Sequence, residues 1–436
     1  MKSNKQKGGI VVKTFEVDNG QVKFTYTYTE LLSKGVKITC CVISKPSACY
    51  KVEECHIPDI INGQSVVSIG RCAFSYVKCE KLYLPNTKCC LNKEALSKVQ
   101  AKEVIWPESI TTIPNRCFAS SKIGKIVFED ASKIKKIDDE AFAFMSDIDE
   151  IEWPSHIKAI PRKCFSYSLI KRVTGLENVR SIGSSAFEYA ENMSFPYLPN
   201  LNIILSAAFI GCKSVEEVIL PPSCQYIYDE AFKGCENLKR ISHSSLWFIG
   251  ERAFEETGLT EFVWPNNYHM VPKGAFKMCR NLEAIHNADS IHRINAAAFE
   301  GTKLTNVTFN NLVEVDSFAF CECPYLSKFE APNLDHVGPQ AFSECKSLGK
   351  IVIEQSPSIF IRVNAFNGSG KIKAYFSNCE ELELMFKEKP EAYDIKRIGS
   401  VLHINMINDN PSENIDCSIN ISMDAEVIAC GPYFDQ

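Results

Sequence analysis

The sequence predicts an α/β repeat solenoid, in which short strands alternate with short helical turns and β-rich segments cap both ends. Three observations support this fold class. Phenylalanine, replaced once by leucine, recurs at intervals of 21 to 24 residues; an aliphatic residue stands five positions before each of these anchors; and a second apolar strand pattern follows it. One such unit cannot bury its own apolar face, so the units must stack to form a continuous core.

The composition excludes two broad classes of protein. Of the 436 residues, 45% are hydrophobic and 23% are charged, which are ordinary globular values and exclude a wholly disordered chain. The formal net charge of −5 leaves no basic excess to neutralise phosphates, so we expect no nucleic-acid binding. No apolar run approaches about 18 residues, so we also expect no membrane span.

The beginning of the chain does not read as an export signal. Met1–Gly9 is polar and basic, and Ile10–Val17 is too short and too interrupted for the apolar core of a signal peptide. A cytoplasmic location is therefore favoured. If an export signal had been trimmed from this chain, the protein would belong at the cell surface or outside the cell.

Residues 1–56 are expected to form an N-terminal β-hairpin cap. Val22–Tyr28 and Val36–Cys40 alternate between apolar and polar residues, and Ser33–Gly35 separates them as a turn. The open end of a solenoid exposes apolar core and a strand edge, which such a hairpin would cover.

Residues 57–376 are expected to form the solenoid, with about 14 repeats. The residue after the aliphatic position is usually Gly, Pro, Asn or Asp, which is turn chemistry, and Ala or Cys precedes the anchor. Each unit therefore predicts a short strand, a tight turn, a helical turn that carries the anchor, and a second strand. The anchors are Phe74, Leu96, Phe118, Phe142, Phe165, Phe187, Phe209, Phe232, Phe254, Phe276, Phe299, Phe320, Phe342 and Phe366.

Residues 377–436 are expected to form a C-terminal cap or a small extra domain. The period is lost after Phe376, and Cys379–Lys389 predicts a short helix that Pro390 ends. Strands are predicted within Val401–Ile407 and Ile415–Ile428, on either side of a polar turn at Asn408–Asn414.

The repeat resembles the BspA-like leucine-rich-repeat family. The resemblance is carried by segments such as Val179–Phe187 and Ala231–Leu238, and by the approach from Ile57 through Gly63 to Gly70. It implies a curved leucine-rich-repeat array without a catalytic motif. It also implies a role like that of the family's cell-surface or secreted members, which bind other proteins in adhesion.

The 20 cysteines do not resemble a disulfide framework, so we interpret most of them as reduced thiols in the core. Five fall three residues after an anchor, in one packing column. Neighbours in that column, such as Cys212 and Cys235 or Cys323 and Cys345, would stack close to disulfide reach. The cysteines of this column are Cys212, Cys235, Cys279, Cys323 and Cys345.

The sequence carries no signature of catalysis, of a metal site or of a cofactor. It lacks the Gly-x-Ser-x-Gly, P-loop, Gly-x-Gly-x-x-Gly and His-Glu-x-x-His motifs, and its eight histidines are scattered. Acidic groups such as Asp138–Glu140 read as solvated surface. We therefore expect a protein that is not an enzyme.

The outward face of the strands is the candidate binding surface. Alternate residues of a strand point outward, and solenoids bind partners on such extended faces. An apolar cluster near the N-terminal end adjoins mixed charges, and a basic run marks the other end. The candidate residues are Tyr83, Ile105, Val127, Glu152, Lys328, Lys350, Lys371 and Lys373.

The predicted function is a non-enzymatic solenoid that binds a protein, or alternatively a glycan, on its concave face. The identity of the protein ligand is not written in the sequence. A second hypothesis is an intracellular scaffold or sensor subunit that uses the same face, which the absent export signal and the many cysteines favour.

Overall fold

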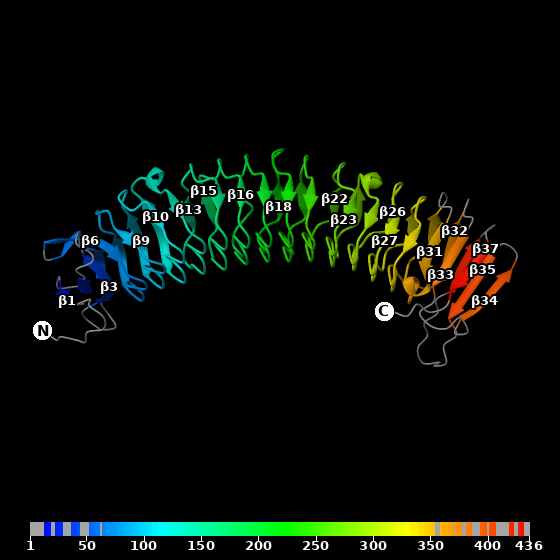
Figure 1. The fold of residues 1–436 in the computed structure, drawn as a ribbon, viewed down its shortest axis with the longest axis horizontal. Helices are drawn as coiled ribbons and strands as arrows, with labels where there is room; N and C mark the ends of the chain where they lie inside the picture. The colour runs from blue at the N-terminus through cyan, green and yellow to red at the C-terminus, as the bar shows by residue number, and fades with distance from the viewer. Residues whose placement is uncertain are drawn as a thin grey trace. The chain divides into compact units, whose positions relative to one another are not determined.

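The structure is a computed structural model. It describes residues 13–18, 22–28, 36–43, 52–61, 63–353, 358–369, 371–376, 381–385, 393–398, 401–406, 418–422 and 426–430, and it describes side chains mainly between residues 53 and 369. The chain divides into two compact units, residues 1–215 and residues 216–436, and each is described here by itself (Figure 1).

The first unit begins with an antiparallel meander. Strands β1 (Lys13–Asp18), β2 (Val22–Tyr28) and β3 (Val36–Ile43) pair in order, which confirms the predicted pairing of the second and third strands. The predicted turn at 33–35 lies outside the described residues. Strand β3 then pairs in parallel with β6 (Gln64–Ile69), so the meander joins the sheet of the first repeats.

Two parallel strand ladders run through the repeats of the first unit. The longer strands form the sheet β4-β7-β9-β11 and the pair β13-β15, and the shorter strands of two residues form the second ladder. The longer strands are β4 (Val52–His56), β7 (Lys78–Tyr83), β9 (Gln100–Trp106), β11 (Lys122–Phe128), β13 (Glu150–Glu152) and β15 (Arg172–Thr174). With β6, the second ladder contains β8 (Cys90–Leu91), β10 (Thr112–Ile113), β12 (Lys136–Ile137), β14 (Ala159–Ile160), β16 (Ser181–Ile182) and β17 (Ile203–Ile204). Strand β5 (Ile60–Ile61) pairs with β6 in the antiparallel direction.

The second unit repeats the same arrangement. Its longer strands are β18 (Glu217–Ile219), β20 (Arg240–Ser242), β22 (Glu261–Val263), β24 (Ala284–His286), β26 (Asn306–Thr308), β28 (Lys328–Glu330), β30 (Lys350–Ile353) and β32 (Lys371–Phe376). Its shorter ladder contains β19 (Tyr226–Ile227), β21 (Phe248–Ile249), β23 (Met270–Val271), β25 (Arg293–Ile294), β27 (Glu314–Val315), β29 (His336–Val337) and β31 (Ser358–Arg362).

The predicted helix over Cys379–Lys389 is wrong where the structure describes it. Residues Glu381–Met385 form strand β33, which pairs in parallel with β31. The alternation of glutamate and leucine in this segment has the period of two that a strand requires, and that period decides the outcome.

The last strands extend both ladders of the second unit. Strand β37 (Glu426–Cys430) pairs with β33, and β36 (Ser418–Ser422) pairs in parallel with β32. Strands β34 (Tyr393–Ile398) and β35 (Val401–Met406) then complete an antiparallel edge next to β36. The predicted strands within Val401–Ile407 and Ile415–Ile428 are confirmed, and the predicted turn at 408–414 lies outside the described residues.

The chain forms a β-solenoid of about 13 turns, and the predicted helical turns are wrong. In the part of the chain that the structure describes, the helices are three short 3₁₀ segments, η1 (Ala131–Lys133), η2 (Ala288–Ser290) and η3 (Val363–Phe366). A different turn carries most anchors: the residues two before and two after the anchor are left-handed, as are Lys163 (φ 53°) and Tyr167 (φ 55°) around Phe165. A left-handed residue cannot continue a right-handed helix, so no helix forms there.

The left-handed residues are held by hydrogen bonds to the next turn. The backbone N–H groups of Lys163, Phe165 and Tyr167 donate to carbonyl oxygens of the following repeat at 3.0, 2.8 and 2.7 Å. These bonds offset the cost of about 1–2 kcal/mol that a non-glycine residue pays in this conformation. The turn is therefore a third hydrogen-bonded side of the solenoid.

The anchor column forms the core of both units. Every anchor is at most 4% exposed, which confirms its predicted burial. In the first unit the rings of Phe142, Phe165 and Phe187 stack at centroid distances of 5.2 and 5.3 Å. In the second unit Phe276 and Phe299 stack at 5.5 Å with an interplanar angle of 1°. Phenylalanine suits this position because a flat ring repeats at the spacing of the strands.

The cysteines three residues after the anchors are buried, as predicted for a packing column. Each Sγ whose bond is described donates to the carbonyl of the anchor in the preceding turn: Cys212 to Phe187 at 2.9 Å, Cys279 to Phe254 at 2.9 Å, Cys323 to Phe299 at 3.1 Å and Cys345 to Phe320 at 2.9 Å. Serine and threonine fill the same column at Ser168, Thr257, Thr302 and Ser369. A small side chain that can donate one hydrogen bond suits this position, although Val77, Val99, Met145 and Ala190 fill it in four of the early repeats.

Among the described residues, no helix has the length and apolar character needed to cross a membrane.

Candidate binding surfaces

The structure places Tyr83, Ile105 and Val127 in one row on the strand face of the first unit. Strands β4, β7, β9 and β11 are hydrogen-bonded in register, and the row runs His56, Tyr83, Ile105, Val127. The rings of His56 and Tyr83 are stacked, with centroids 4.1 Å apart and an interplanar angle of 6°. We call these four residues the strand-face row.

A row of alternating charge flanks the strand-face row. It contains Glu54, Lys81, Glu103 and Lys125 from the same four strands. Glu54 accepts from His56 at 3.0 Å and from the Tyr83 hydroxyl at 3.3 Å, and Lys81 pairs with Glu103 at 3.3 Å. The bond from His56 lowers the pKa of Glu54, so this carboxylate stays ionised beside the apolar row.

The predicted apolar residues are less exposed than the pattern alone suggests. Tyr83, Ile105 and Val127 are half-buried rather than fully exposed. Glu152 is exposed, and its strand β13 pairs with β15 rather than with β11. The more exposed apolar side chains on the strand face are Ile219 (67%) and Val263 (49%) of the second unit.

The basic run of the second unit is partly neutralised. Lys328 and Lys350 are register partners, but Lys328 pairs with Glu330 at 2.5 Å. That bond lowers the pKa of Glu330, which keeps an anion within the run. Lys350 pairs in register with Lys373 rather than with Lys371, so the predicted alignment of the last repeat is wrong by two residues. The side chains of Lys371 and Lys373 lie outside the described residues.

The structure shows an apolar surface on the turn edge that the sequence interpretation missed. Phe144, Tyr167 and Tyr189, each two residues after an anchor, stack at centroid distances of 5.2 and 5.1 Å. They are 43%, 44% and 39% exposed, and Leu169, two residues after Tyr167 in the sequence, is 45% exposed. We call these four residues the aromatic column. The sequence does contain a signal for this column, because aromatic residues occupy the position two after the anchor in four of the first six repeats.

The charges around the aromatic column pair with one another. Arg162 lies 3.8 Å from Glu140, Lys163 lies 3.7 Å from Glu188, and the Tyr167 hydroxyl donates to Glu188 at 3.4 Å. The far end of the column is closed by Gly211, since a Cβ built there would meet the ring of Tyr189. The column therefore presents ring edges and one aliphatic side chain between satisfied ion pairs.

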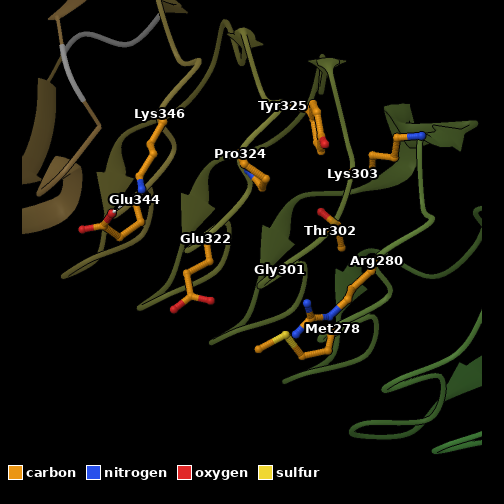
Figure 2. Close-up of a pocket in the computed structure, with 10 residues that line it drawn as sticks. All are labelled: Met278, Arg280, Gly301, Thr302, Lys303, Glu322, Pro324, Tyr325, Glu344 and Lys346. Carbon is orange, nitrogen blue, oxygen red and sulfur yellow. Dashed lines mark ion pairs between the residues drawn. The ribbon is translucent and has the colours of Figure 1, made fainter.

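A groove of about 660 Å³ lies on the turn edge of the second unit (Figure 2). Gly301 opens it, because this residue lacks a side chain between Met278 and Glu322 in the column that is aromatic in the first unit. Basic and acidic side chains both line it, and Lys346 lies 3.9 Å from Glu344. Its lining includes Arg280, Lys303, Lys346, Glu322, Glu344 and Tyr325.

Within the described residues, no three His, Cys, Asp or Glu side chains gather to hold a metal ion. The groove in the second unit is lined by side chains of mixed charge.

One solved structure supports this architecture, and two others are less similar to the chain. A leucine-rich repeat protein from Bacteroides ovatus has a TM-score of 0.61 and 23% identity, covering 85% of this chain and 94% of that one. The pneumococcal vaccine antigen PcpA has a TM-score of 0.40 and 16% identity, covering 86% and 88%. A leucine rich cell surface protein from Faecalibacterium prausnitzii has a TM-score of 0.38 and 18% identity, covering 86% and 91%. No curated protein matches the chain.

The sequence match identifies the repeat itself. The BspA type leucine rich repeat region, in six copies, matches residues 47–171, 158–279 and 247–373, which together span most of the chain. The anchors, the aliphatic column and the second strand all lie within these residues. The protein belongs to the BspA type leucine-rich-repeat family.

Proposed function

We propose that this protein is a non-enzymatic binding protein whose ligand is another protein, held through the aromatic column of the first unit. One observation carries the proposal: three stacked rings and Leu169 stay exposed together on successive turns. Exposed apolar residues that form one patch mark a contact surface, whereas single ones do not. Tyrosine is also common among the residues that contribute most to protein binding.

The stacking favours a protein ligand over a glycan. Sugars bind aromatic residues by lying on a free ring face, but here most faces are covered by the neighbouring ring or by Gly211. The exposed ring edges suit apolar side chains and the faces of a partner's aromatic rings. The paired charges around the column form a polar rim, as at ordinary protein interfaces.

The strand-face row is a second candidate surface of the same function. The stacked His56 and Tyr83 are held by Glu54, so binding would cost little side-chain entropy there. The alternating charges beside the row would select the orientation of a partner. Glu152 and the basic run of Lys328, Lys350, Lys371 and Lys373 would contribute at the periphery of the strand face.

Quantitative affinity capture with three variants tests the proposal. Phe144→Ala/Tyr167→Ala/Tyr189→Ala should lose the partner that the wild-type protein enriches, with an affinity reduced about 30-fold or more for a loss of about 2 kcal/mol. Tyr83→Asp/Ile105→Asp/Val127→Asp tests the strand-face row separately. Tyr197→Ala is the matched control, because Tyr197 is 77% exposed but outside both surfaces.

The purified partner must then be measured directly against each folded variant. Equal affinity of the wild type and the aromatic variant, with unchanged melting curves, would remove the aromatic column from the proposal. Loss of binding in the strand-face variant alone would move the site to that row.

The alternative function, an intracellular scaffold or sensor subunit, differs in compartment rather than in surface. Fractionation of the native cell separates the two. Recovery of the protein with the soluble interior, with all its thiols reduced, would favour the scaffold. Recovery from the cell surface would favour an adhesion role.

A further inference from the structure

Two thiols lie directly below the groove of the second unit. Cys323 and Cys345 occupy equivalent positions in successive turns, and both are fully buried. Their neighbours in sequence, Glu322 and Pro324 on one turn and Glu344 and Lys346 on the next, line the groove (Figure 2). The two cysteines thus lie in the two turns that form one end of the groove.

The backbone brings the two cysteines within disulfide range. Cys323 and Cys345 are 22 residues apart, the same offset as the register partners Lys328 and Lys350 of β28 and β30. Residues at this offset stand one strand spacing apart, about 4.8 Å between backbones. Disulfides join residues whose Cα atoms are about 4.4–6.8 Å apart, so a bond requires little movement of the backbone.

The side chains also point the same way. Each Sγ donates to the anchor carbonyl of its preceding turn, at 3.1 Å for Cys323 and 2.9 Å for Cys345. The two thiols contact one another, and the Thr302 hydroxyl lies 3.2 Å from the Sγ of Cys323. Formation of a bond would require only that the two sulfur atoms turn from the carbonyls towards each other.

The same column supplies an internal comparison. Cys279 is equally buried, but its neighbours in the column are Thr257 and Thr302, and the Thr257 hydroxyl lies 3.2 Å from its Sγ. Cys279 therefore has the same burial and the same hydrogen bond without a thiol beside it. Any chemistry that needs two adjacent thiols should occur at Cys323 and Cys345 and not at Cys279.

We propose that Cys323 and Cys345 form a reversible disulfide, with a low-molecular-weight disulfide such as oxidised glutathione as the oxidant. The thiolate of one cysteine attacks a sulfur of the oxidant, forms a mixed disulfide and releases one glutathione thiolate. The second cysteine loses its proton, attacks the protein sulfur of that mixed disulfide and releases the other glutathione. Two protein thiols are oxidised and one oxidised glutathione is reduced to two thiols, so atoms and electrons balance.

The bond would fix one end of the groove. It would tie Glu322 and Pro324 to the turn of Glu344 and Lys346, and it would close a loop that contains β28. Cross-linking across such a loop restricts the unfolded chain and raises the melting temperature. Because the thiols are buried, the exchange should require local opening and should be slow.

Mass spectrometry of the wild-type protein tests the proposal. The native protein is brought to equilibrium in buffers of increasing ratio of oxidised to reduced glutathione, acid-quenched, alkylated and digested. The expected products include a cross-linked peptide pair that joins Cys323 to Cys345 and is two hydrogen atoms lighter than its reduced parts, while Cys279 remains alkylated. Thiols at both positions in the most oxidising buffer would overturn the proposal, as would a bond from either one to Cys321.

Three serine variants provide the controls. Cys323→Ser and Cys345→Ser should each remove the cross-link and the rise in melting temperature on oxidation, whereas Cys279→Ser should retain both. Serine suits this column, because Ser369 already donates from it to the carbonyl of Phe342. Melting curves under reducing conditions show whether each variant folds. An oxidation-dependent rise that persists in Cys345→Ser would also overturn the proposal.

Discussion

The position two residues after the anchor carries different side chains in the two units on the same backbone. In the first unit it holds Phe144, Tyr167 and Tyr189, with φ of 58°, 55° and 50°. In the second unit it holds Gly301, Glu322 and Glu344, with φ of 72°, 56° and 61°. The N–H groups of Tyr167 and Glu322 each donate to the next turn, at 2.7 and 2.8 Å. The backbone is therefore set by the repeat, while the side chain is free to define a surface.

The largest expected loss of stability comes from the anchor column, which both units share. Phe165→Ala and Phe232→Ala should each cost about 3–5 kcal/mol of unfolding free energy, because both remove a fully buried ring from the core. Denaturant unfolding measures this cost. Phe144→Ala is the control of the same chemistry on the surface and should cost far less. A small effect at either buried position would break the equivalence of the two cores.

The buried cysteines three residues after the anchors allow the two units to be compared at a second position of the repeat. Burial raises the pKa of Cys212 in the first unit and of Cys279 in the second to about 12, against an ordinary value of 9.0. At pH 8 both should react with iodoacetamide about 1,000-fold more slowly than a free thiol, with a rate that keeps rising up to about pH 12. After denaturation all 20 cysteines of the reduced chain should react. Rapid labelling of one of the two in the native protein would show that its unit opens more readily.

Two glycines at the position two residues after the anchor allow two contributions to the free energy of unfolding to be separated: the strain of the left-handed backbone and the packing of an added side chain. Gly211 and Gly301 have φ of 70° and 72°, so an alanine pays about 1 kcal/mol at either one. An added Cβ at Gly211 would overlap the ring of Tyr189, whereas at Gly301 it would overlap the flexible end of the Met278 side chain. Gly211→Ala should therefore cost about 1–3 kcal/mol more than Gly301→Ala.

A double variant shows where that difference arises. Gly211→Ala combined with Tyr189→Ala should recover most of the extra cost, because the obstructing ring is gone. Chemical denaturation of the single and double variants measures the coupling. Equal costs at the two glycines would mean that the ring of Tyr189 moves aside freely.

The smallest expected effect concerns the aromatic residues themselves. Tyr167→Gly relieves a left-handed backbone by about 1 kcal/mol and removes two stacking contacts of about 0.5–1.5 kcal/mol each. The net loss should be about 0–2 kcal/mol, so the melting temperature should fall by only a few degrees. A large loss of stability would show that the column is a structural element rather than a free surface.

The fold could be predicted because the same apolar pattern recurs in every repeat. Each anchor and each aliphatic position is buried against its own copy in the next turn, so one pattern appears many times in the sequence. The paired strands within 22–28 and 36–40 were also predictable, since alternation and a turn are local signals.

The turn could not be predicted in the same way. Its left-handed residues include Glu140, Lys163 and Tyr167, which carry no local preference for that conformation. Hydrogen bonds to the following turn impose it, and those bonds exist only after stacking. A helix was the reasonable local interpretation of Ala-Phe, and tertiary contacts overrode it.

The sequence could predict which side chains of the candidate surfaces point outward, but not how exposed those side chains are. The period of two predicted that Tyr83, Ile105 and Val127 share one outward row, but the exposed fraction of each side chain depends on packing across strands, which that period does not reveal. The register of Lys350 with Lys373 depends on the lengths of the links between strands, which a column alignment of the sequence does not reveal.

The hydrogen bonds of the turn have a consequence for how such a chain can evolve. The bonds from Lys163, Phe165 and Tyr167 join backbone atoms of one turn to backbone atoms of the next, whatever the side chains are. Duplication or deletion of one whole turn would leave every such bond with an equivalent acceptor. A gene encoding this solenoid could therefore gain or lose single turns by unequal recombination and keep a folded product. The exposed columns would then diversify while the chain remained foldable at each step.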